Sequence, residues 1–485
     1  MVVLLLILIP LIGGIITFFL PKQAASPVAI LVSIVELILG VVTYQQYIKG
    51  QHALLKFQEV WIEKLGATFA LELNNGLPLL MVLLTALVFP LIFIAWNNKQ
   101  PEQPGRFYGL MLLAQTGLMG VFLATDALLF YLFWEVALIP VYFLSSLYGG
   151  PRRIAVTFKF FVYTFAGSLL MLIGFLYLYN QAPLHSFSWD SLLSTGRNVS
   201  GFNQQWLFWM LFVAFAIKMP IFPFHTWQPD AYEESATPVT MVLSALMVKM
   251  GLFAVIRWLL PLVPLGAQYW MNLVMWLSIA GIVYASCMAL VQTNIKRLIA
   301  YSSVAHIGLM SACLFAHNAD YLNIQGAAVQ MFNHGINIAG MWILVGILEH
   351  RLGTQDLREM GGIAKIAPYF TVALVLISLA NIALPLTNGF VGEFMMFNAL
   401  FNSPTSFPVW MTLLAGLGVI LSAVYTLSMV QKVAYGELNP KTKQFGDLKL
   451  NEKLIVIVIM VLILVLGFYP KPVLDLVSVT GINLN

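Results

Sequence analysis

The stretch QWLFWMLFVAFAIKMPIFP, residues 205 to 223, decides the fold class of this chain. It is a nearly unbroken apolar run, and a helix of about 20 apolar residues is long enough to cross a bilayer. The run contains Lys218 and is then interrupted by Pro220 and Pro223. Because proline removes a helix hydrogen bond and forces a kink or a break, this stretch predicts a membrane helix interrupted beside a buried charge.

The rest of the chain has the composition of a membrane protein. Of its 485 residues, 60% are hydrophobic and only 9% are charged, whereas soluble domains carry about 25% charged residues. The net charge of +4 is small and scattered, so we expect no nucleic-acid partner. Cys287 and Cys313 lie within apolar stretches and have neither a metal-ligand spacing nor the pattern of a disulfide framework.

Apolar runs of about 20 residues, divided where Pro, Gly, Asn or charge interrupts them, predict an all-α polytopic protein with fourteen transmembrane helices. The first run has no basic segment before it and is followed at once by another, so we expect a spanning helix and not a signal peptide. The predicted helices cover residues 2–20, 27–48, 78–97, 107–124, 127–148, 154–180, 205–223, 238–260, 270–291, 296–317, 322–349, 367–401, 409–431 and 454–470.

Basic residues are unevenly distributed over the predicted loops. One set of alternate loops, which includes Lys99, holds fifteen Lys and Arg residues, and the other set holds six. Because basic loops stay cytoplasmic, both termini are expected on the periplasmic side of a bacterial inner membrane.

The twelfth predicted helix is interrupted in the same way as the seventh, by Pro385, Asn388 and Gly389. The two lie five helices apart and run in opposite directions, which is typical of two inverted five-helix repeats; ordinary membrane-helix proline is the alternative. We therefore divide the chain into N-terminal helices 1–3 (1–106), a first repeat of helices 4–8 (107–260), a second, inverted repeat of helices 9–13 (270–431), and a C-terminal loop with helix 14 (432–485).

Six ionisable residues are predicted near mid-membrane depth, where each costs roughly 2.5 to 3.5 kcal/mol and seldom persists without a partner, a water cavity or a function. At about 1.5 Å rise per residue, most of them reach a similar depth. Carboxylate, ammonium and imidazole groups each hold and release a proton. We interpret the row as a path for stepwise proton transfer, formed by Glu135, Lys218, Lys249, His306, His334 and Glu393.

Each assignment has a structural alternative. Glu135 and Lys218 suit a switch, because an acid beside a lysine keeps that lysine charged, but a structural ion pair is the alternative. His306 and His334 are alternatively hydrogen-bonded core histidines. Glu36, central in the second helix, is expected to contact lipid or a neighbouring subunit, with a direct role as the alternative.

Other charged residues are expected near the membrane surfaces. Asp126 and Lys159 lie near helix ends, where a charged group can reach water, and Asp126 alternatively helps to form a proton intake path. A loop expected on the cytoplasmic side, with no Lys or Arg, is interpreted as a solvated turn, with proton collection as the alternative. It contains His225, Asp230, Glu233 and Glu234.

The chain contains no GxGxxG or Walker loop, no CxxC cluster and no HExxH sequence. Nucleotide, iron-sulfur and zinc sites are therefore not expected, and any redox chemistry is expected on other chains.

Seven stretches resemble the antiporter-like subunits of respiratory complex I, the proton-pumping NADH:quinone oxidoreductase, and the resemblance covers nearly the whole chain. The M type is the most similar, because Glu393 stands where related types usually carry lysine. The stretches are DALLFYLFWEVALIPVYFL (126–144), KFFVYT (159–164), AIKMPIFPFHTWQPDAY (216–232), LMVKMGLFAVIRW (246–258), IKRLIAYSSVAHIGLM (295–310), FNHGINIAGMWILVG (332–346) and TNGFVGEFMMF (387–397).

The resemblance implies that Glu135 and Lys218 form a charge pair, that Lys249 and His306 or His334 are relay groups, and that Glu393 is the terminal group toward the outer side. It also implies L- and N-type subunits, small membrane subunits and lipids as partners, with NADH, FMN, iron-sulfur clusters and quinone bound by other chains. Gln228 and Tyr232 depart from the family's usual leucine and histidine, and Pro238 lies two places later than the usual proline.

Three other functions are compatible with these patterns. They are a subunit of a sodium/proton antiporter, a subunit of a membrane-bound hydrogenase or formate-oxidising complex, and a purely structural membrane scaffold. Glu393 argues against the antiporter, and neighbouring genes distinguish the second function from complex I.

Overall fold

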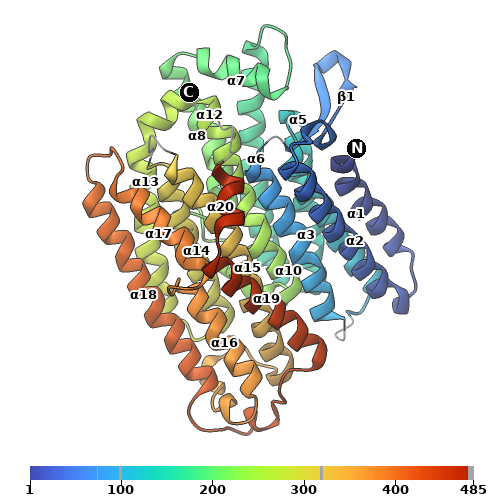
Figure 1. Cartoon of the computed structure of the whole chain (residues 1–485), viewed down its shortest axis with the longest axis vertical. Helices are drawn as coiled ribbons and strands as arrows, with labels where there is room; N and C mark the ends of the chain where they lie inside the picture. Colours follow the sequence, from blue (N-terminus) through green and yellow to red (C-terminus); the bar gives the residue numbers. More distant parts are fainter. Residues whose placement is uncertain (74, 98–100, 317–320, 479–485) are drawn as a thin grey trace. The chain divides into compact units, whose positions relative to one another are not determined.

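The computed structural model describes residues 1–73, 75–97, 101–316 and 321–478, and most of these residues are helical (Figure 1). The prediction of an all-α membrane protein is confirmed in this coarse form. Lys99 and the last residue of the tenth predicted helix, His317, lie outside the described residues.

Within the described ranges, eleven helices are long and apolar enough to cross a membrane, so the count of fourteen stays a prediction. They are α2 (Lys22–Ile48), α3 (Gly76–Trp96), α4 (Pro104–Leu123), α5 (Ala127–Tyr148), α6 (Arg153–Gln181), the continuous span Thr237–Leu262, α13 (Pro264–Leu290), α14 (Ile295–Leu314), α15 (Leu322–Leu352), α18 (Pro408–Ala434) and α19 (Leu450–Phe468).

Shorter elements fill the remaining predicted positions and the connections. The apolar ones are α1 (Val2–Phe18), α8 (Gly201–Lys218), α16 (Pro368–Asn381) and α17 (Asn388–Phe401). The connections contain α7 (Trp189–Asn198), α9 (Gln228–Glu234) and the 3₁₀ turns η1 (His52–Leu55), η2 (Glu63–Leu65), η5 (Leu357–Glu359), η6 (Ile363–Lys365) and η7 (Thr442–Gln444), and α20 (Lys471–Ser478) follows α19.

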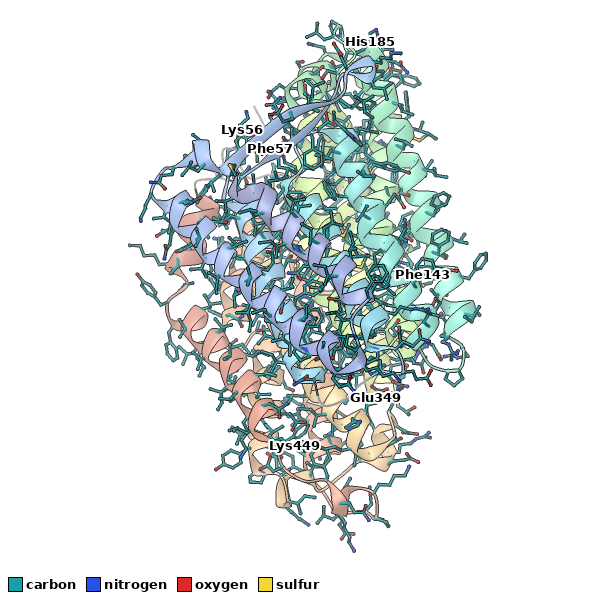
Figure 2. The ribbon with its side chains drawn as sticks, turned by 90° about the vertical axis from the view of Figure 1, so that its right-hand side faces the viewer. Lys56, Phe57, Phe143, His185, Glu349 and Lys449 are labelled. Atoms are coloured by element: carbon teal, nitrogen blue, oxygen red, sulfur yellow. The ribbon has the colours of Figure 1, made fainter. Side chains whose placement is uncertain are left out.

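Apolar side chains cover the outward faces of the helices. Phe143 on α5 is an example, since it is 45% exposed and projects away from its helix (Figure 2). Lipid tails offer no hydrogen-bond partners. Helices with internally satisfied backbone hydrogen bonds and apolar outer faces are therefore suited to a lipid environment.

A β-hairpin between α2 and α3 was not predicted from the sequence. Strands β1 (Lys56–Ile62) and β2 (Ala67–Glu72) pair antiparallel, and Gly66 takes a left-handed φ of 58° in the turn. The Ser186 hydroxyl donates to the Gly66 carbonyl at 3.1 Å, which places the hairpin turn beside the segment that contains His185 (Figure 2).

The chain folds as two compact units, and one crossing between them falls at the interruption predicted after Lys218. Unit 1 comprises Met1–Met219, Leu246–Met271 and Leu476–Asn485, and unit 2 comprises Pro220–Ala245 and Asn272–Asp475. Unit 1 contains Glu135, Lys218 and Lys249, while unit 2 contains His306, His334 and Glu393.

Candidate functional site

Lys218 is the last residue of α8, and its side chain is almost completely buried in unit 1. Its Nζ atom lies 5.6 Å from the ring centroid of Trp134 on α5 and 5.9 Å from that of Phe160 on α6. Aromatic faces attract an ammonium group, and the negative end of the α8 dipole adds a favourable contribution. The predicted interruption therefore begins directly after a lysine that is held among aromatic rings.

Glu135 lies next to Trp134 on α5 and interacts electrostatically with Lys218. Ser168 on α6 also lies near its carboxyl group. Within the described residues, neither Glu135 Oε1 nor Lys218 Nζ has a hydrogen-bond partner. The acid and the lysine are therefore neighbours without a closed salt bridge, and the structural ion pair considered from the sequence is not formed.

Lys249 is completely buried on α11 (Val248–Ala254), in the middle of the span Thr237–Leu262. A π-helical stretch lies on each side of α11, η3 (Leu243–Met247) and η4 (Val255–Leu259). The span begins with α10 (Thr237–Val242) and ends with α12 (Leu260–Leu262). Because π-helical turns in membrane and soluble helices occur frequently at functional sites, this irregularity supports a special role for the segment.

Gly251 allows α11 to contact the end of α8 closely. A Cβ atom at this position would lie 2.7 Å from both the Met219 nitrogen and the Phe215 oxygen. Real Cβ atoms do not approach backbone atoms so closely, so only glycine fits. This contact packs the helical turn after Lys249 against the residue that follows Lys218.

In unit 2, three of the six predicted residues form one cluster. His306 Nδ1 on α14 lies 3.2 Å from Glu393 Oε1 on α17. The ring of His334 on α15 has its centroid 5.5 Å from that of His306. All three side chains are less than 10% exposed. His306 is therefore bonded to a buried carboxylate that can exchange a proton with it, and not simply to core backbone.

A small cavity lies beside His306 and Glu393, and Ser422 and Tyr425 on α18 also line it. The volume open to the centre of a water molecule is about 20 Å³, and about 10 to 15 Å³ is enough to hold one water molecule. The cavity therefore has room for a single water next to the histidine–glutamate contact.

Three polar neighbours of this cluster were not identified from the sequence. The Tyr425 hydroxyl donates to Ser302 Oγ at 3.0 Å, and Asn381 Nδ2 donates to the same oxygen at 3.3 Å. Ser302 lies four residues before His306, one helical turn away on the same face. This spacing could have identified Ser302 from the sequence. Nothing in the local sequence indicates Asn381 or Tyr425, because both come from other helices.

The predicted interruption of the twelfth helix is present, and α15 satisfies the backbone groups around it. Asn337 Nδ2 donates to the Ala380 carbonyl at 3.1 Å, and Asn333 Nδ2 donates to the Asn388 carbonyl at 2.7 Å. A Cβ atom at Gly389 would lie 2.4 Å from the Ala380 oxygen, so glycine is required there. The helix that carries His334 therefore also holds the interruption next to Glu393.

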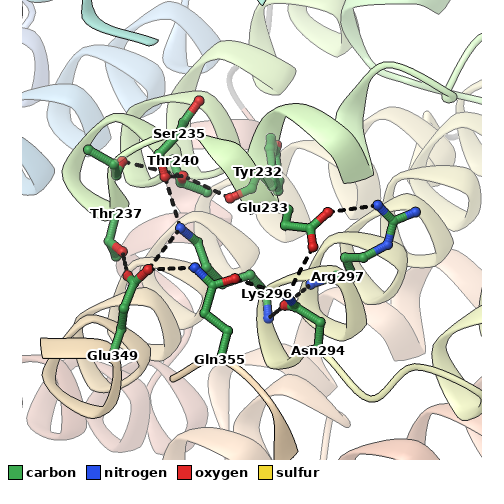
Figure 3. A network of polar contacts seen from close by, with 11 residues as sticks. Tyr232, Glu233, Ser235, Thr237, Thr240, Asn294, Lys296, Arg297, Glu349 and Gln355 are labelled. Carbon is green, nitrogen blue, oxygen red and sulfur yellow. Dashed lines mark hydrogen bonds and ion pairs between the residues drawn. The ribbon is translucent and has the colours of Figure 1, made fainter. Parts of the chain in front are cut away.

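The segment after the first interruption is tied to α14 and is not the solvated turn that we expected (Figure 3). Arg297 Nη1 contacts Asp230 Oδ1 at 3.0 Å and Glu233 Oε2 at 2.9 Å. His225 and Glu234 are at least nine-tenths buried. The expectation was wrong because the positive partner, Arg297, comes from the first turn of α14, which is distant in sequence.

Lys296 is the centre of the same network (Figure 3). It is 1% exposed, donates to the Ser235 carbonyl at 2.8 Å and pairs with Glu349 at 3.6 Å. Glu349 also accepts hydrogen bonds of 2.6 Å from Thr237 and Gln355. This network, Lys296 with Ser235 and Glu349 and the two residues bonded to Glu349, fixes the first residues of the span that leads to Lys249.

The departures from the family pattern at Gln228 and Tyr232 are accommodated in the core. Both residues are completely buried in α9. The ring of Tyr232 lies edge-on to Trp342, with centroids 5.9 Å apart.

Two further expectations were wrong. Asp126 does not extend to water but is buried, accepts from the Leu128 and Leu129 amides at 3.0 and 3.2 Å, and so caps α5. Burial raises the pKa of Asp126, and these hydrogen bonds oppose that shift. Glu36 is 0% exposed, so it contacts neither lipid nor a neighbouring subunit. Lys159 is half-buried on α6.

Comparisons with known proteins agree over nearly the whole chain. The family described as NADH:quinone oxidoreductase/Mrp antiporter, TM, matches residues 124–422. NADH-quinone oxidoreductase subunit M of Escherichia coli K12 is 34% identical over 97% of this chain and 95% of its own length. F(420)H(2) dehydrogenase subunit M of Methanosarcina mazei is also 34% identical, over 97% and 95%.

A chain in the structure of respiratory complex I from Thermus thermophilus with bound NADH matches with a TM-score of 0.87 and 28% identity. The match covers 99% of this chain and 98% of that chain. Both the sequence and the fold thus match over almost their full length. The chain belongs to the NADH:quinone oxidoreductase/Mrp antiporter family of transmembrane subunits, among its subunit M members.

Proposed function

We propose that this chain is the subunit M of a bacterial respiratory complex I and that it carries protons through the buried residues of its two units. The observation that carries the site assignment is the contact between His306 and Glu393, a buried base bonded to a buried acid beside room for one water. Such a contact suits proton exchange, because imidazole and carboxylate groups both hold and release protons.

In unit 1, Glu135 and Lys218 act as the switch. While Glu135 is charged and near, it stabilises the ammonium form of Lys218 through space. When the two move apart, this stabilisation weakens and Lys218 gives up its proton, for which Lys249 is the proposed acceptor. The open arrangement supports this proposal, because no closed salt bridge has to be broken first.

In unit 2, His334 and His306 are the relay and Glu393 is the terminal group. The proton moves from His306 Nδ1 to Glu393 Oε1, atoms that are 3.2 Å apart. The contact supports His306 as the group next to Glu393. We propose His334, whose ring centroid is 5.5 Å from that of His306, as the preceding group.

The positions of the two interruptions support the same function. Both interruptions occur close to a row residue: α8 ends at Lys218, and Glu393 is in the second turn of α17. We propose that these are corresponding elements of helices 4–8 and 9–13, and that each interruption lets its half-path open and close.

The assembly follows from the subunit M relatives. We infer that L- and N-type subunits and small membrane subunits are its neighbours in a bacterial inner membrane, that both termini lie on the periplasmic side, and that NADH, FMN, iron-sulfur clusters and quinone bind to other chains. The Methanosarcina relative supports a second candidate, a complex that oxidises a reduced F420 cofactor. Either donor leaves the role of this chain unchanged.

The test of this function uses inverted membrane vesicles that contain the assembled complex. Lys218→Ala and Glu135→Ala are expected to abolish proton uptake driven by NADH while NADH-to-quinone electron transfer and complex assembly remain. Full proton uptake in either variant overturns the proposed switch. Uptake driven by the reduced F420 cofactor and not by NADH favours the second candidate, and co-purification with a sodium-dependent exchanger overturns both.

A further inference from the structure

Helix α2 has a polar buried face and an apolar exposed face. Its buried residues are spaced by three or four positions and include Ser26, Ser33, Glu36, Gly40 and Thr43. Its exposed residues include Leu31, Ile34, Ile38 and Val41. Figure 1 shows α2 beside α1 and α3, and α2 contacts α4 as well. Glu36 is the one acidic residue of this helix, and it faces other helices of unit 1.

The carboxyl group of Glu36 is completely covered by this chain. Glu36 is 0% exposed, and neither Oε1 nor Oε2 has a hydrogen-bond partner among the described residues. It also lies outside residues 124–422, which match the family. Burying an ionised carboxylate is very unfavourable unless it is paired and hydrogen-bonded.

The elements around α2 offer no positive partner near Glu36. Neither α1 nor α3 contains an ionisable residue, and α4 contains only Arg106 and Tyr108. Arg106 is exposed in the first turn of α4, and Tyr108 lies near Ser26 without a hydrogen bond from its hydroxyl. Ser26 is ten residues, or about 15 Å, before Glu36 along α2.

The remaining ionisable groups lie at the two ends of α2. Lys22 starts the helix, fourteen residues or about 21 Å before Glu36. Tyr44 and Tyr47 belong to the last turns, where His52 of η1 packs against Tyr47 with ring centroids 5.2 Å apart. Glu36 therefore cannot be buried as a paired anion.

From this geometry we propose that Glu36 is a second proton-binding site of the chain, separate from the row, and that it carries its proton at neutral pH. Its site is the polar contact region of α2 with α3 and α4. The proposal does not depend on the function proposed above, because it rests on burial and on the absence of a countercharge near this carboxyl among the residues that the structure describes.

The opposing turn of α3 suits the protonated form. Ser26 bonds to Asn97 at 2.7 Å, and a Cβ at Gly40 would lie 3.3 Å from that of Ala86. This antiparallel register places Glu36 opposite the turn between Ala86 and Pro90. Pro90 has no N–H, so the Ala86 carbonyl lacks its usual helix donor. A protonated acid has an O–H to donate, whereas a carboxylate can only accept.

Helix α4 adds a neutral polar side chain at a similar level. Gln115 is completely buried, and neither atom of its amide has a partner among the residues that the structure describes. Gln115 lies seven residues after Tyr108 on α4, and Ser33 lies seven residues after Ser26 on α2. Because Tyr108 lies near Ser26, Gln115 is at the level of Ser33, which is within one helical turn of Glu36. An amide can accept from the acid O–H without supplying a charge.

The first measurement is covalent labelling of the assembled complex in its membrane with dicyclohexylcarbodiimide, followed by mass spectrometry of the peptide that contains Glu36. The acid proton moves to a carbodiimide nitrogen while the carboxyl oxygen bonds to the central carbon. The acyl group then shifts from oxygen to nitrogen, which gives a stable adduct that retains every atom of both reactants. We expect Glu36 to be labelled at neutral pH by this apolar reagent and not by a water-soluble carbodiimide. An unlabelled Glu36 overturns the proposal.

The second measurement compares wild type with Glu36→Gln, in which a neutral amide replaces the neutral acid. Because the folded wild type favours protonated Glu36, the stability that this residue contributes is present at low pH and falls as the pH rises, and the variant lacks this contribution. The ratio of wild-type to variant half-life at a fixed elevated temperature is expected to fall by up to about tenfold per pH unit through the neutral range. Ser33→Ala, on the same face, is the matched control and should show a constant ratio. A ratio for Glu36→Gln that does not change with pH, or that rises, overturns the proposal.

Discussion

His306 Nδ1 lies 3.2 Å from Glu393 Oε1, although the two residues are on helices that are distant in the sequence, α14 and α17. If this contact transfers a proton, removing the imidazole removes a step that a positioned group typically accelerates by about 10²- to 10⁴-fold. His306→Gln is therefore expected to reduce electron-driven proton uptake at least about tenfold in inverted vesicles, while the complex assembles.

The control for this variant is His185→Gln, at an exposed histidine in the 182–188 segment. It should leave proton uptake unchanged. Normal uptake by His306→Gln would show that the contact with Glu393 is structural only.

Tyr425 contributes a hydroxyl group that donates to Ser302 beside the cavity. Tyr425→Phe deletes this hydroxyl and keeps the ring, so the loss of one buried hydrogen bond is expected to cost about 1 kcal/mol of stability. Proton uptake is expected to fall severalfold if the hydroxyl helps to orient the proton near Glu393. Thermal unfolding and uptake check the two effects separately, with Tyr435→Phe, at a 53% exposed tyrosine, as the control.

Gly251 allows close contact between α11 and the end of α8. In Gly251→Ala the new methyl group meets the Phe215 oxygen and the Met219 nitrogen, so the helices must separate, at a cost of about 1 to 3 kcal/mol. We expect a lower melting temperature and weaker coupling of proton uptake to electron transfer.

Gly416→Ala on α18 is the matched control, because a Cβ at that position has no atom within 4 Å. Alanine favours a helix over glycine by up to about 1 kcal/mol, so this variant should be neutral or slightly stabilising. Equal effects of the two substitutions would contradict the packing argument.

Lys296 is buried, and it pairs with the partly exposed Glu349 at the start of the span leading to Lys249. Lys296→Met leaves the partly exposed Glu349 carboxylate without its cation, and we expect a cost of up to about 3 kcal/mol, the lower end of the range for breaking a fully buried pair. The double variant Lys296→Met with Glu349→Gln removes both charges and should be more stable than the single variant. Melting temperatures of the wild type, the two single variants and the double variant measure the coupling between Lys296 and Glu349.

The exposed pair between Arg358 and Asp356 supplies the comparison. Arg358 holds the pKa of Asp356 at about 2, yet water screens this pair. Arg358→Met should not measurably change stability near neutral pH. If Lys296→Met also leaves the stability unchanged, the Lys296 network does not anchor the span.

The sequence predicted those features that depend on local pattern. Apolar runs predicted the membrane helices, and Pro220, Pro385 and Gly389 indicated the two interruptions because backbone chemistry alone requires them. The β-hairpin was missed since most residues of β1 are exposed and so carry no alternating apolar signal.

Features that depend on a distant partner could not be predicted in this way. Arg297 was counted only as a basic loop residue, although it pairs with Asp230 and Glu233 from a segment more than sixty positions away. Glu36 was assigned to a lipid or subunit contact because an apolar helix does not show which of its faces is covered. The pairing of His306 with Glu393 likewise became visible only when α14 and α17 were placed side by side.

The interruption between α16 and α17 is held by Asn333 and Asn337, which flank His334 on the same turns of α15. The two asparagines and the imidazole of His334 are consequently parts of one helix and move together with it. Rotating α15 by a single residue step, about 100°, releases both asparagine bonds and turns His334 away from His306 at once. If His334 is a relay group as proposed, opening the interruption and disconnecting the relay would therefore be one event, and a proton could not pass while the interruption is open.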